Sequence, residues 1–159
     1  TAKRHRPFPA VKVKILGDGP DRQRLEELAR QENAPVDFLG YQDHGSMAAW
    51  LRASDITVNS LVKSAVQSIV TKIGDYLASG KPMINTGSSP EFRNKVTTDG
   101  FGLNVEAENP EALADVLEEL ARNPSLRKIM GARGRAVAER EFDQRTSYLA
   151  IVNLLRNLM

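Results

Sequence analysis

Short apolar runs alternate with helical patterns from Val11 to Val105, and this alternation restricts the chain to few folds. Runs rich in β-branched and aromatic residues, bounded by turn residues, predict strands. The segments between them carry apolar residues at the spacing of one helix face. The predicted strands are Val11–Leu16, Val36–Gly40, Ile56–Val58, Pro82–Asn85 and Phe101–Val105. Strands and helices in this order predict a three-layer α/β/α fold, in which helices cover both faces of a parallel sheet of at least five strands.

The helix boundaries are predicted from capping residues. Pro20 opens the first helix, Ser46 caps the second, and a third begins near Ser68 and ends at Ser79, with Gly80 as the residue beyond its C-terminus. Ser88-Ser89-Pro90-Glu91 predicts a capping box. The chain is then entirely helical, with segments predicted at Pro110–Arg122, Pro124–Glu141 and Asp143–Met159.

Composition limits the class of protein. A chain of 159 residues, 41% hydrophobic and 26% charged, fits one globular domain from residue 1 to 159, with 1–10 as a linker or truncated helix end. The absence of cysteine excludes disulfides and is compatible with the cytoplasm, and the net charge of +2 is too small to indicate a nucleic-acid partner. No apolar run approaches the roughly 20 residues of a membrane helix. Because nothing apolar and periodic precedes Phe8, we expect a fragment of a longer protein.

Ligands of open parallel sheets bind beyond the carboxyl ends of the strands, so the loops that follow the strands are the candidate site. The most informative segment runs from Gln67 to Pro82. A helix that starts near Ser68 offers unpaired N–H groups to an anion, and Lys72 adds a compact positive charge. Asp75 lies three residues further on, where a carboxylate can accept hydrogen bonds from a ribose diol. The alternative, an exposed Lys72–Asp75 ion pair without a ligand, stays open on spacing alone.

Other residues favour structural interpretations. His5 and His44 have no spaced partner and no paired Asp-x-Asp is present, so no metal site is predicted. Trp50 is expected in the core. The basic run from Arg127 to Arg135 is expected to be a solvated helix face, with attraction to a membrane surface as the minor alternative. The last helix carries an apolar stripe of which part is expected to be exposed.

The segment Asp75–Ile84 resembles the E-A-x-A-x-G-x-P-V-I signature of glycosyltransferase family 4. Ile15–Pro20 is similar to the h-h-G-x-G-P turn of the family, and Val36–Gly40 to its V-x-F-L-G strand. These motifs stand in the family's order, and the resemblance extends from Val11 to Met159. It implies a Rossmann-like domain that forms the donor-binding, C-terminal half of a GT-B fold, in an enzyme similar to those that build capsular and lipopolysaccharide chains.

The resemblance also implies a set of residues that bind a nucleotide sugar. These are Gly17, Gly19, Gly40, Tyr41, Gln67, Ile69, Val70, Thr71, Lys72 and Asp75. For Gly17 and Gly19 a plain strand-to-helix turn is an equal alternative, and Tyr41 either stacks on the base or covers the edge of the core. Where the family has E-x7-E, this chain has Gln67 and Asp75, so the first position has no charge. No catalytic residue is assigned.

The function implied is transfer of a sugar from a nucleotide diphosphate sugar to a polysaccharide or glycolipid, with retained configuration and without a cofactor or metal. The partners expected are the nucleotide sugar and an N-terminal domain of the same enzyme, and the isolated domain is expected to be inactive. A cytoplasmic location is predicted, with peripheral membrane contact of the full-length protein as an addition. A nucleotide-sugar 2-epimerase and a non-catalytic binding or interaction module are the alternatives.

Overall fold

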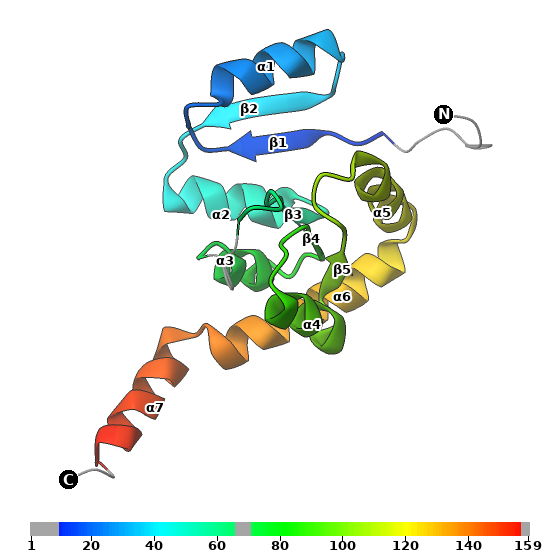
Figure 1. The fold of residues 1–159 in the computed structure, drawn as a ribbon. Helices are drawn as coiled ribbons and strands as arrows, with labels where there is room; N and C mark the ends of the chain where they lie inside the picture. The colour runs from blue at the N-terminus through cyan, green and yellow to red at the C-terminus, as the bar shows by residue number, and fades with distance from the viewer. Residues whose placement is uncertain (1–9, 66–70, 157–159) are drawn as a thin grey trace. The chain divides into compact units, whose positions relative to one another are not determined.

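The structure, a computed structural model, describes residues 10–65 and 71–156 and shows two compact units, Thr1–Trp50 and Leu51–Met159. Each unit is an α/β arrangement with parallel strands (Figure 1). The five strands predicted from the sequence are all present, but they pair as one sheet of two strands and one of three. The parallel α/β class is therefore confirmed, whereas a single domain over the whole chain stays a prediction.

The first unit holds β1 (Val13–Leu16), α1 (Arg22–Gln31) and β2 (Val36–Gly40), and α2 (His44–Ala53) begins in it. β1 and β2 pair with Val13 opposite Val36, and the register shifts between Ile15 and Leu16, so that Leu16 lies opposite Gly40. Across this ladder Lys14 donates to Asp37, and Lys12 lies 3.2 Å from the same carboxylate. These contacts, first the one with Lys14, lower the pKa of Asp37.

The start of α2 differs from the prediction. Asp43 precedes the helix, and its carboxylate accepts from the backbone N–H of Ser46 at 3.0 Å and from the Ser46 hydroxyl at 2.7 Å. The capping residue is therefore Asp43, and Ser46 belongs to the first turn, because a carboxylate three residues earlier reaches the same unpaired N–H groups. Trp50, expected in the core, is 37% exposed, and the Lys14 ammonium lies 5.3 Å from its ring centroid.

The second unit contains the remaining strands in the order β3-β4-β5, each pair parallel. Its strands are β3 (Thr57–Asn59), β4 (Met83–Asn85) and β5 (Gly102–Asn104). Its helices are α3 (Ile73–Ala78), α4 (Pro90–Asp99), α5 (Pro110–Arg122), α6 (Pro124–Glu141) and α7 (Gln144–Arg156). The predicted bounds of α5 and α6 are confirmed, since Asn109 and Asn123 cap helices that begin with proline.

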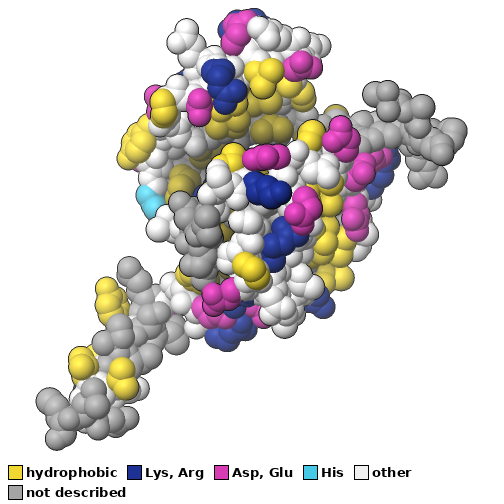
Figure 2. Space-filling view, viewed as in Figure 1, with side chains coloured by type: hydrophobic (Ala, Val, Ile, Leu, Met, Phe, Trp, Pro, Cys, Tyr) yellow, Lys and Arg dark blue, Asp and Glu magenta, His cyan; other side chains and the backbone are white. Residues whose placement is uncertain are grey.

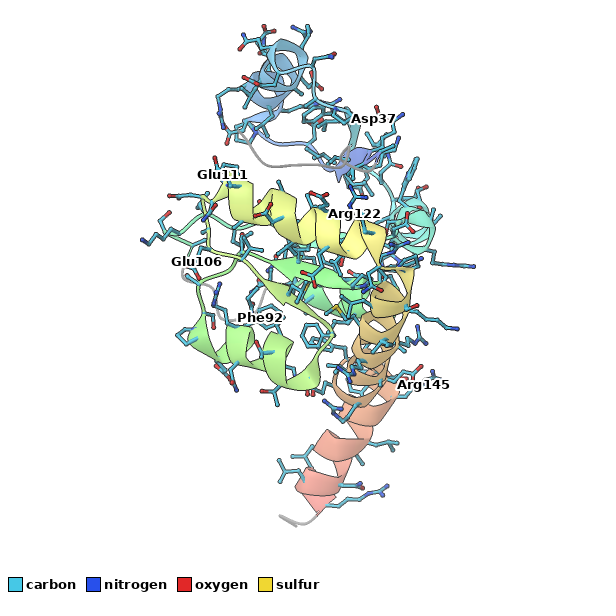
Figure 3. The ribbon with its side chains drawn as sticks, turned by 90° about the vertical axis from the view of Figure 1, so that its right-hand side faces the viewer. Asp37, Phe92, Glu106, Glu111, Arg122 and Arg145 are labelled. Atoms are coloured by element: carbon cyan, nitrogen blue, oxygen red, sulfur yellow. The ribbon has the colours of Figure 1, made fainter. Side chains whose placement is uncertain are left out.

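Side chains of β4 alternate between two apolar clusters, which places this unit in three layers. Met83 packs in a cluster with residues of α3, α4 and α6, where Phe92 faces the strands and lies 6.4 Å from Phe101 between ring centroids (Figure 3). The next residue, Ile84, packs in the other cluster, with α5 and the first two turns of α6. Successive residues of a strand face opposite sides, so both faces of this sheet are covered by helices.

Two arginines of α6 cap the carboxyl ends of other helices, while the basic side chains of the run are mostly exposed as predicted and only Arg127 among them is half-buried. Arg127 donates from Nη1 to the carbonyls of Leu120 and Ala121 at the end of α5, at 2.6 and 2.9 Å. Arg135 donates to Ala78, the last residue of α3, at 2.8 Å. The final carbonyls of a helix lack intrahelical donors and carry a partial negative charge, so a guanidinium there is stabilising.

The Arg127 cap provides a test of this packing. Arg127→Met keeps most of the aliphatic stem and removes the donors, so we expect it to lower the free energy of unfolding by about 1–2 kcal/mol. Lys128→Met is the matched control, because Lys128 is the exposed neighbour on the same helix and carries the same charge. Urea denaturation of both variants measures the difference, and equal stability of the two would contradict the capping role.

The α7 helix extends from α6 with apolar side chains exposed along it (Figures 1 and 2). Those described as exposed are Tyr148, Leu149, Val152, Leu154 and Leu155. This agrees with the prediction that part of the apolar stripe is uncovered. Within the described residues, no helix combines the length and the apolar character needed to cross a membrane.

Candidate functional site

The predicted site residues fall in both units. In the first unit, Gly17 and Gly40 end the two parallel strands with positive φ angles of 121° and 66°. The Gly17 N–H donates to the Gly40 carbonyl at 2.7 Å, which joins the two turns. These conformations favour glycine, so both residues are required by the backbone at the carboxyl edge of this sheet.

Tyr41 follows Gly40 and is 82% exposed, so it does not cover the core edge in this structure. Gly19 has open space around it, with no atom within 4 Å of a Cβ placed there. Gly17, Gly40 and Tyr41 thus lie together at the carboxyl edge of β1 and β2, as the sequence predicts. An exposed aromatic ring at such an edge is a surface on which a planar base can stack.

Arg22 is a residue near these turns that sequence reasoning missed. A Cβ at Gly40 would lie 3.0 Å from Arg22 Nη1, so the guanidinium covers this glycine. Glu26 accepts from Arg22 Nε at 2.7 Å, and Asp18 lies 3.5 Å from Nη1. The hydrogen bond with Glu26 is the main cause of the raised pKa of Arg22. The only sequence signal was the four-residue spacing of Asp18, Arg22 and Glu26.

In the second unit the helix that carries the predicted phosphate and ribose residues begins later than expected. Gln67, Ile69 and Val70 lie outside the described residues. Thr71 and Lys72 form a turn, and α3 begins at Ile73 rather than near Ser68. Thr71 is β-branched, and such residues lose side-chain freedom in a helix. The predicted end is confirmed, since Gly80 has φ 69° immediately beyond the last turn.

Thr71 and Asp75 line one groove of about 310 Å³ between α3 and the end of α6. The other lining residues are Gly74, Ala78, Arg135, Ala138, Glu139, Phe142 and Asp143. Three carboxylates and one guanidinium give this groove a net negative character, and Phe142 adds an aromatic wall. Carboxylates accept hydrogen bonds from hydroxyls, whereas they repel phosphate. The groove therefore suits a hydroxyl-rich ligand better than a diphosphate.

Lys72 is half-buried, and its ammonium lies 5.8 Å from the centroid of the Tyr76 ring. Burial lowers the pKa of Lys72, because removal from water disfavours the charged form. Burial also raises the pKa of Tyr76, and the charge of Asp75 adds to this. Lys72 thus stands at the N-cap of α3 and lies against an aromatic ring, and its joint role with Asp75 stays a prediction. A partly desolvated ammonium of this kind gains from an anionic ligand.

Asparagines end all three strands of the second sheet, a feature not used in the sequence reasoning. Asn59, Asn85 and Asn104 lie opposite one another in the register. The Nδ2 of Asn59 donates to Asn85 Oδ1 at 2.9 Å, and the Nδ2 of Asn85 donates to Asn104 Oδ1 at 2.8 Å. We call this row the asparagine ladder. Its sequence signal was the recurrence of asparagine at or next to the carboxyl ends of the last three predicted strands.

The asparagine ladder supports the turn that follows β4. The Gly87 N–H donates to Asn85 Oδ1 at 3.1 Å, and Arg93 donates to the Gly87 carbonyl at 3.4 Å and to the Val105 carbonyl at 3.0 Å. Thr86 accepts from the Leu61 N–H at 2.7 Å, which ties this turn to the loop after β3. These hydrogen bonds join the turn after β4 to Leu61, to Arg93 of α4 and to the end of β5.

The predicted capping box is not formed, because the cap is one residue later than expected and the third helical position is then Phe92. Ser89, not Ser88, caps α4, and its hydroxyl accepts from the Phe92 N–H at 3.3 Å, while Pro90 takes the first helical position. Glu91 is exposed in the first turn. Among the residues that the structure covers, no cluster of three or more His, Asp or Glu side chains could hold a metal ion. Metal independence remains a prediction.

The chain is similar in sequence to known glycosyltransferases. The family described as Glycosyl transferases group 1 matches residues 2–123. Over 155 residues the chain is 30% identical to a GDP-mannose-dependent phosphatidylinositol monomannoside mannosyltransferase of Corynebacterium glutamicum. It is 30% identical over 152 residues to a lipopolysaccharide core biosynthesis glycosyltransferase of Rhizobium meliloti. The matches cover 94% and 93% of this chain, but 40% and 42% of the two relatives.

Solved structures share the fold. Sucrose-phosphate synthase from Thermosynechococcus elongatus aligns with a TM-score of 0.77 at 24% identity, over 92% of this chain and 38% of that one. Anabaena HepE in complex with UDP aligns with a TM-score of 0.77 at 20% identity, over 94% and 42%. Both are GT-B glycosyltransferases, so the Rossmann-like fold and its place in half of a GT-B enzyme are confirmed. The chain spans about two fifths of these proteins, and it belongs to the glycosyl transferases group 1 family.

Proposed function

We propose that the chain is the donor-binding part of a retaining glycosyltransferase, which transfers a sugar from a nucleotide diphosphate sugar to a polysaccharide or glycolipid. The observation that carries this is the groove that joins Thr71 and Asp75 beside the half-buried Lys72, in a chain of this family. Neighbours of the same fold bind UDP and UDP-glucose, and two relatives act in glycolipid or lipopolysaccharide synthesis. An acceptor of that class therefore fits.

The chemistry of the described residues divides the ligand between them. The acidic groove suits the ribose, whose diol would donate to the Asp75 carboxylate. Lys72 suits the diphosphate, because its half-buried ammonium is a compact positive charge that is partly removed from water. Gly17, Gly19, Gly40 and the exposed Tyr41 suit the base. Gln67, Ile69 and Val70 remain assigned to the donor, although they lie outside the described residues.

The catalytic contribution proposed for this chain is stabilisation of the diphosphate as it leaves. That contribution needs fixed positive charge and N–H groups, and no acid or base from these residues. Groups that act on the acceptor are proposed to come from an N-terminal domain, so this chain alone is expected to bind the donor without turnover. A metal-independent reaction in the cytoplasm, with peripheral membrane contact by the full-length enzyme, completes the proposal.

Titration of the chain with UDP, GDP, UDP-glucose and GDP-mannose tests this function. We expect at least one nucleotide to raise the melting temperature at millimolar concentration, because ligands that bind only the folded state stabilise it. AMP at the same concentration is the control for unspecific anion binding. If no nucleotide diphosphate shifts the melting temperature more than AMP does, the proposed function fails for this chain.

The lowered pKa of Lys72 predicts a pH dependence of nucleotide binding. A diphosphate favours the charged ammonium and raises its pKa, so binding takes up a proton between the lowered pKa of the unliganded protein and the higher pKa of the complex. Affinity for UDP or GDP is therefore highest below the unliganded pKa and falls as the pH rises through it. Calorimetric titration from pH 7 to pH 10 measures this fall. Lys72→Met should remove the pH dependence, Lys72→Arg should keep tight binding throughout, and an unchanged slope in Lys72→Met would contradict the assignment.

A further inference from the structure

The amide orientations of the asparagine ladder are fixed by its outer end. The Nδ2 of Asn104 donates to the Arg93 carbonyl at 2.9 Å, and a carbonyl can only accept. Asn104 therefore presents Oδ1 to Asn85, and Asn85 donates to this oxygen from Nδ2. The opposite end of the Asn85 amide is an acceptor, and the Gly87 N–H that it accepts at 3.1 Å agrees with this. Asn59 is left to donate, so its Oδ1 turns away from the ladder.

That Oδ1 of Asn59 is a buried acceptor with no hydrogen-bond partner among the residues that the structure describes. Asn59 is 1% exposed, so bulk water does not compensate for the missing donor. A buried acceptor without a donor destabilises a protein, and such groups are rare in native structures. Turning the Asn59 amide by 180° would not satisfy this acceptor, because Asn59 Oδ1 would then face Asn85 Oδ1 and both oxygens can only accept.

The polar side chain of Asn59 is not needed for the stability of the fold. If its side chain were apolar, Asn85 Oδ1 would still accept from the Gly87 N–H, and no new polar group would be left unpaired. The same change at Asn104 would remove its hydrogen bond to the Arg93 carbonyl and would leave Asn85 Nδ2 with only the 3.5 Å contact to the Gly87 carbonyl. Asn59 is therefore the one member of the ladder whose side chain costs stability without being needed by its neighbours. A residue kept against stability at the carboxyl edge of a parallel sheet indicates function.

We propose that Asn59 is a further donor-binding residue, whose Oδ1 accepts a hydrogen bond from a hydroxyl of the transferred sugar. This rests on the proposed function, since it takes a nucleotide sugar as the ligand. Asn59 Oδ1 is covered in this structure, so the sugar hydroxyl must displace the covering groups to reach it. The bound hydroxyl is then shielded from water. A hydrogen bond formed in such a dry environment is stronger than one at a wet surface. The sugar, unlike the diphosphate, can supply the neutral donor that an amide oxygen needs.

The test compares Asn59→Leu with the wild-type chain and with Asn104→Leu, both of which keep the shape of the side chain. For each protein we measure the melting temperature and, by calorimetry, the affinity for UDP-glucose relative to UDP and for GDP-mannose relative to GDP. The ratio isolates the sugar, because effects on the nucleotide part cancel. We expect Asn59→Leu to keep or raise the melting temperature while the ratio falls about tenfold. We expect Asn104→Leu to lower the melting temperature and leave the ratio unchanged.

Two results would overturn the inference. An unchanged ratio in Asn59→Leu means that the sugar does not use this acceptor, whatever happens to the melting temperature. An equal fall of the ratio in Asn104→Leu means that the ladder acts only as a unit that shapes the edge. Neither result concerns the binding of UDP or GDP itself, so the proposed function would still stand. If the wild-type chain binds none of the four nucleotides, the proposed function fails and this inference fails with it.

Discussion

Alanine in place of Gly131 is expected to lower the free energy of unfolding by about 3 kcal/mol. Gly131 lies on α6 where the helix crosses the end of α3, and a Cβ there would stand 2.0 Å from the Gly80 carbonyl oxygen and 2.8 Å from its carbon. These are backbone atoms, so no side-chain rotation relieves the clash. Gly80 itself is held at φ 69° by the end of α3. The two helices must separate, and the buried cluster of Ile73 and Leu77 opens with them.

Helix propensity acts in the opposite direction, which makes the sign of this prediction informative. Alanine is favoured over glycine by about 1 kcal/mol within a helix, so a loss of stability must come from the clash. Gly134→Ala is the matched control on the same helix, because a Cβ there meets the Leu77 side chain at 3.3 Å and the Phe101 Cβ at 3.4 Å. We expect this variant to be near neutral in urea denaturation. Equal stability of the two variants would mean that α6 does not pack on Gly80 as described.

The sequence predicted those parts of the fold that depend on local chemistry. The proline and asparagine pairs at Asn109 and Asn123 determine where α5 and α6 begin, and Gly80 ends α3 where a left-handed residue is needed. The strands were identified because each apolar run stands between turn residues. Contacts between distant segments could not be predicted in this way. The clash at Gly131 and the capping by Arg127 depend on how α6 crosses other helices, and no spacing within one segment contains that information.

The candidate site, like the fold, was predicted from the sequence only in part. Gly17, Gly40 and Tyr41 were predicted from their position after two strands, and the structure brings them to one sheet edge. Lys72 is the N-cap of α3 and its ammonium lies near Tyr76, the neighbour of Asp75, so the face predicted for Lys72 and Asp75 stays a prediction. The asparagine ladder was missed, although its members stand in the sequence at three strand ends. Their significance depends on the register, which aligns them only when the strands pair.

The largest functional effect is expected for Asp75→Asn, which keeps the shape of the side chain and removes its charge. If Asp75 holds the ribose diol, the variant loses charge-assisted hydrogen bonds worth about 1.5–3 kcal/mol each. We therefore expect the affinity for UDP or GDP to fall between tenfold and a hundredfold by calorimetry. Asp143→Asn is the control for general charge, because Asp143 lines the same groove beyond the end of α6, where Arg145 contacts lower its pKa.

A nucleotide that lacks one hydroxyl makes the Asp75 prediction specific to the ribose. 2′-Deoxy-UDP cannot donate its second hydrogen bond, so the wild-type chain should bind it more weakly than UDP. In Asp75→Asn the difference between UDP and 2′-deoxy-UDP should shrink, because the interaction is already weakened from the protein side. A repulsive effect of the groove on the diphosphate would behave differently: removing a carboxylate would then strengthen the binding of both nucleotides equally. Equal changes for UDP and 2′-deoxy-UDP, in either direction, would therefore exclude Asp75 as the ribose ligand and leave the acidic groove to another hydroxyl-bearing group.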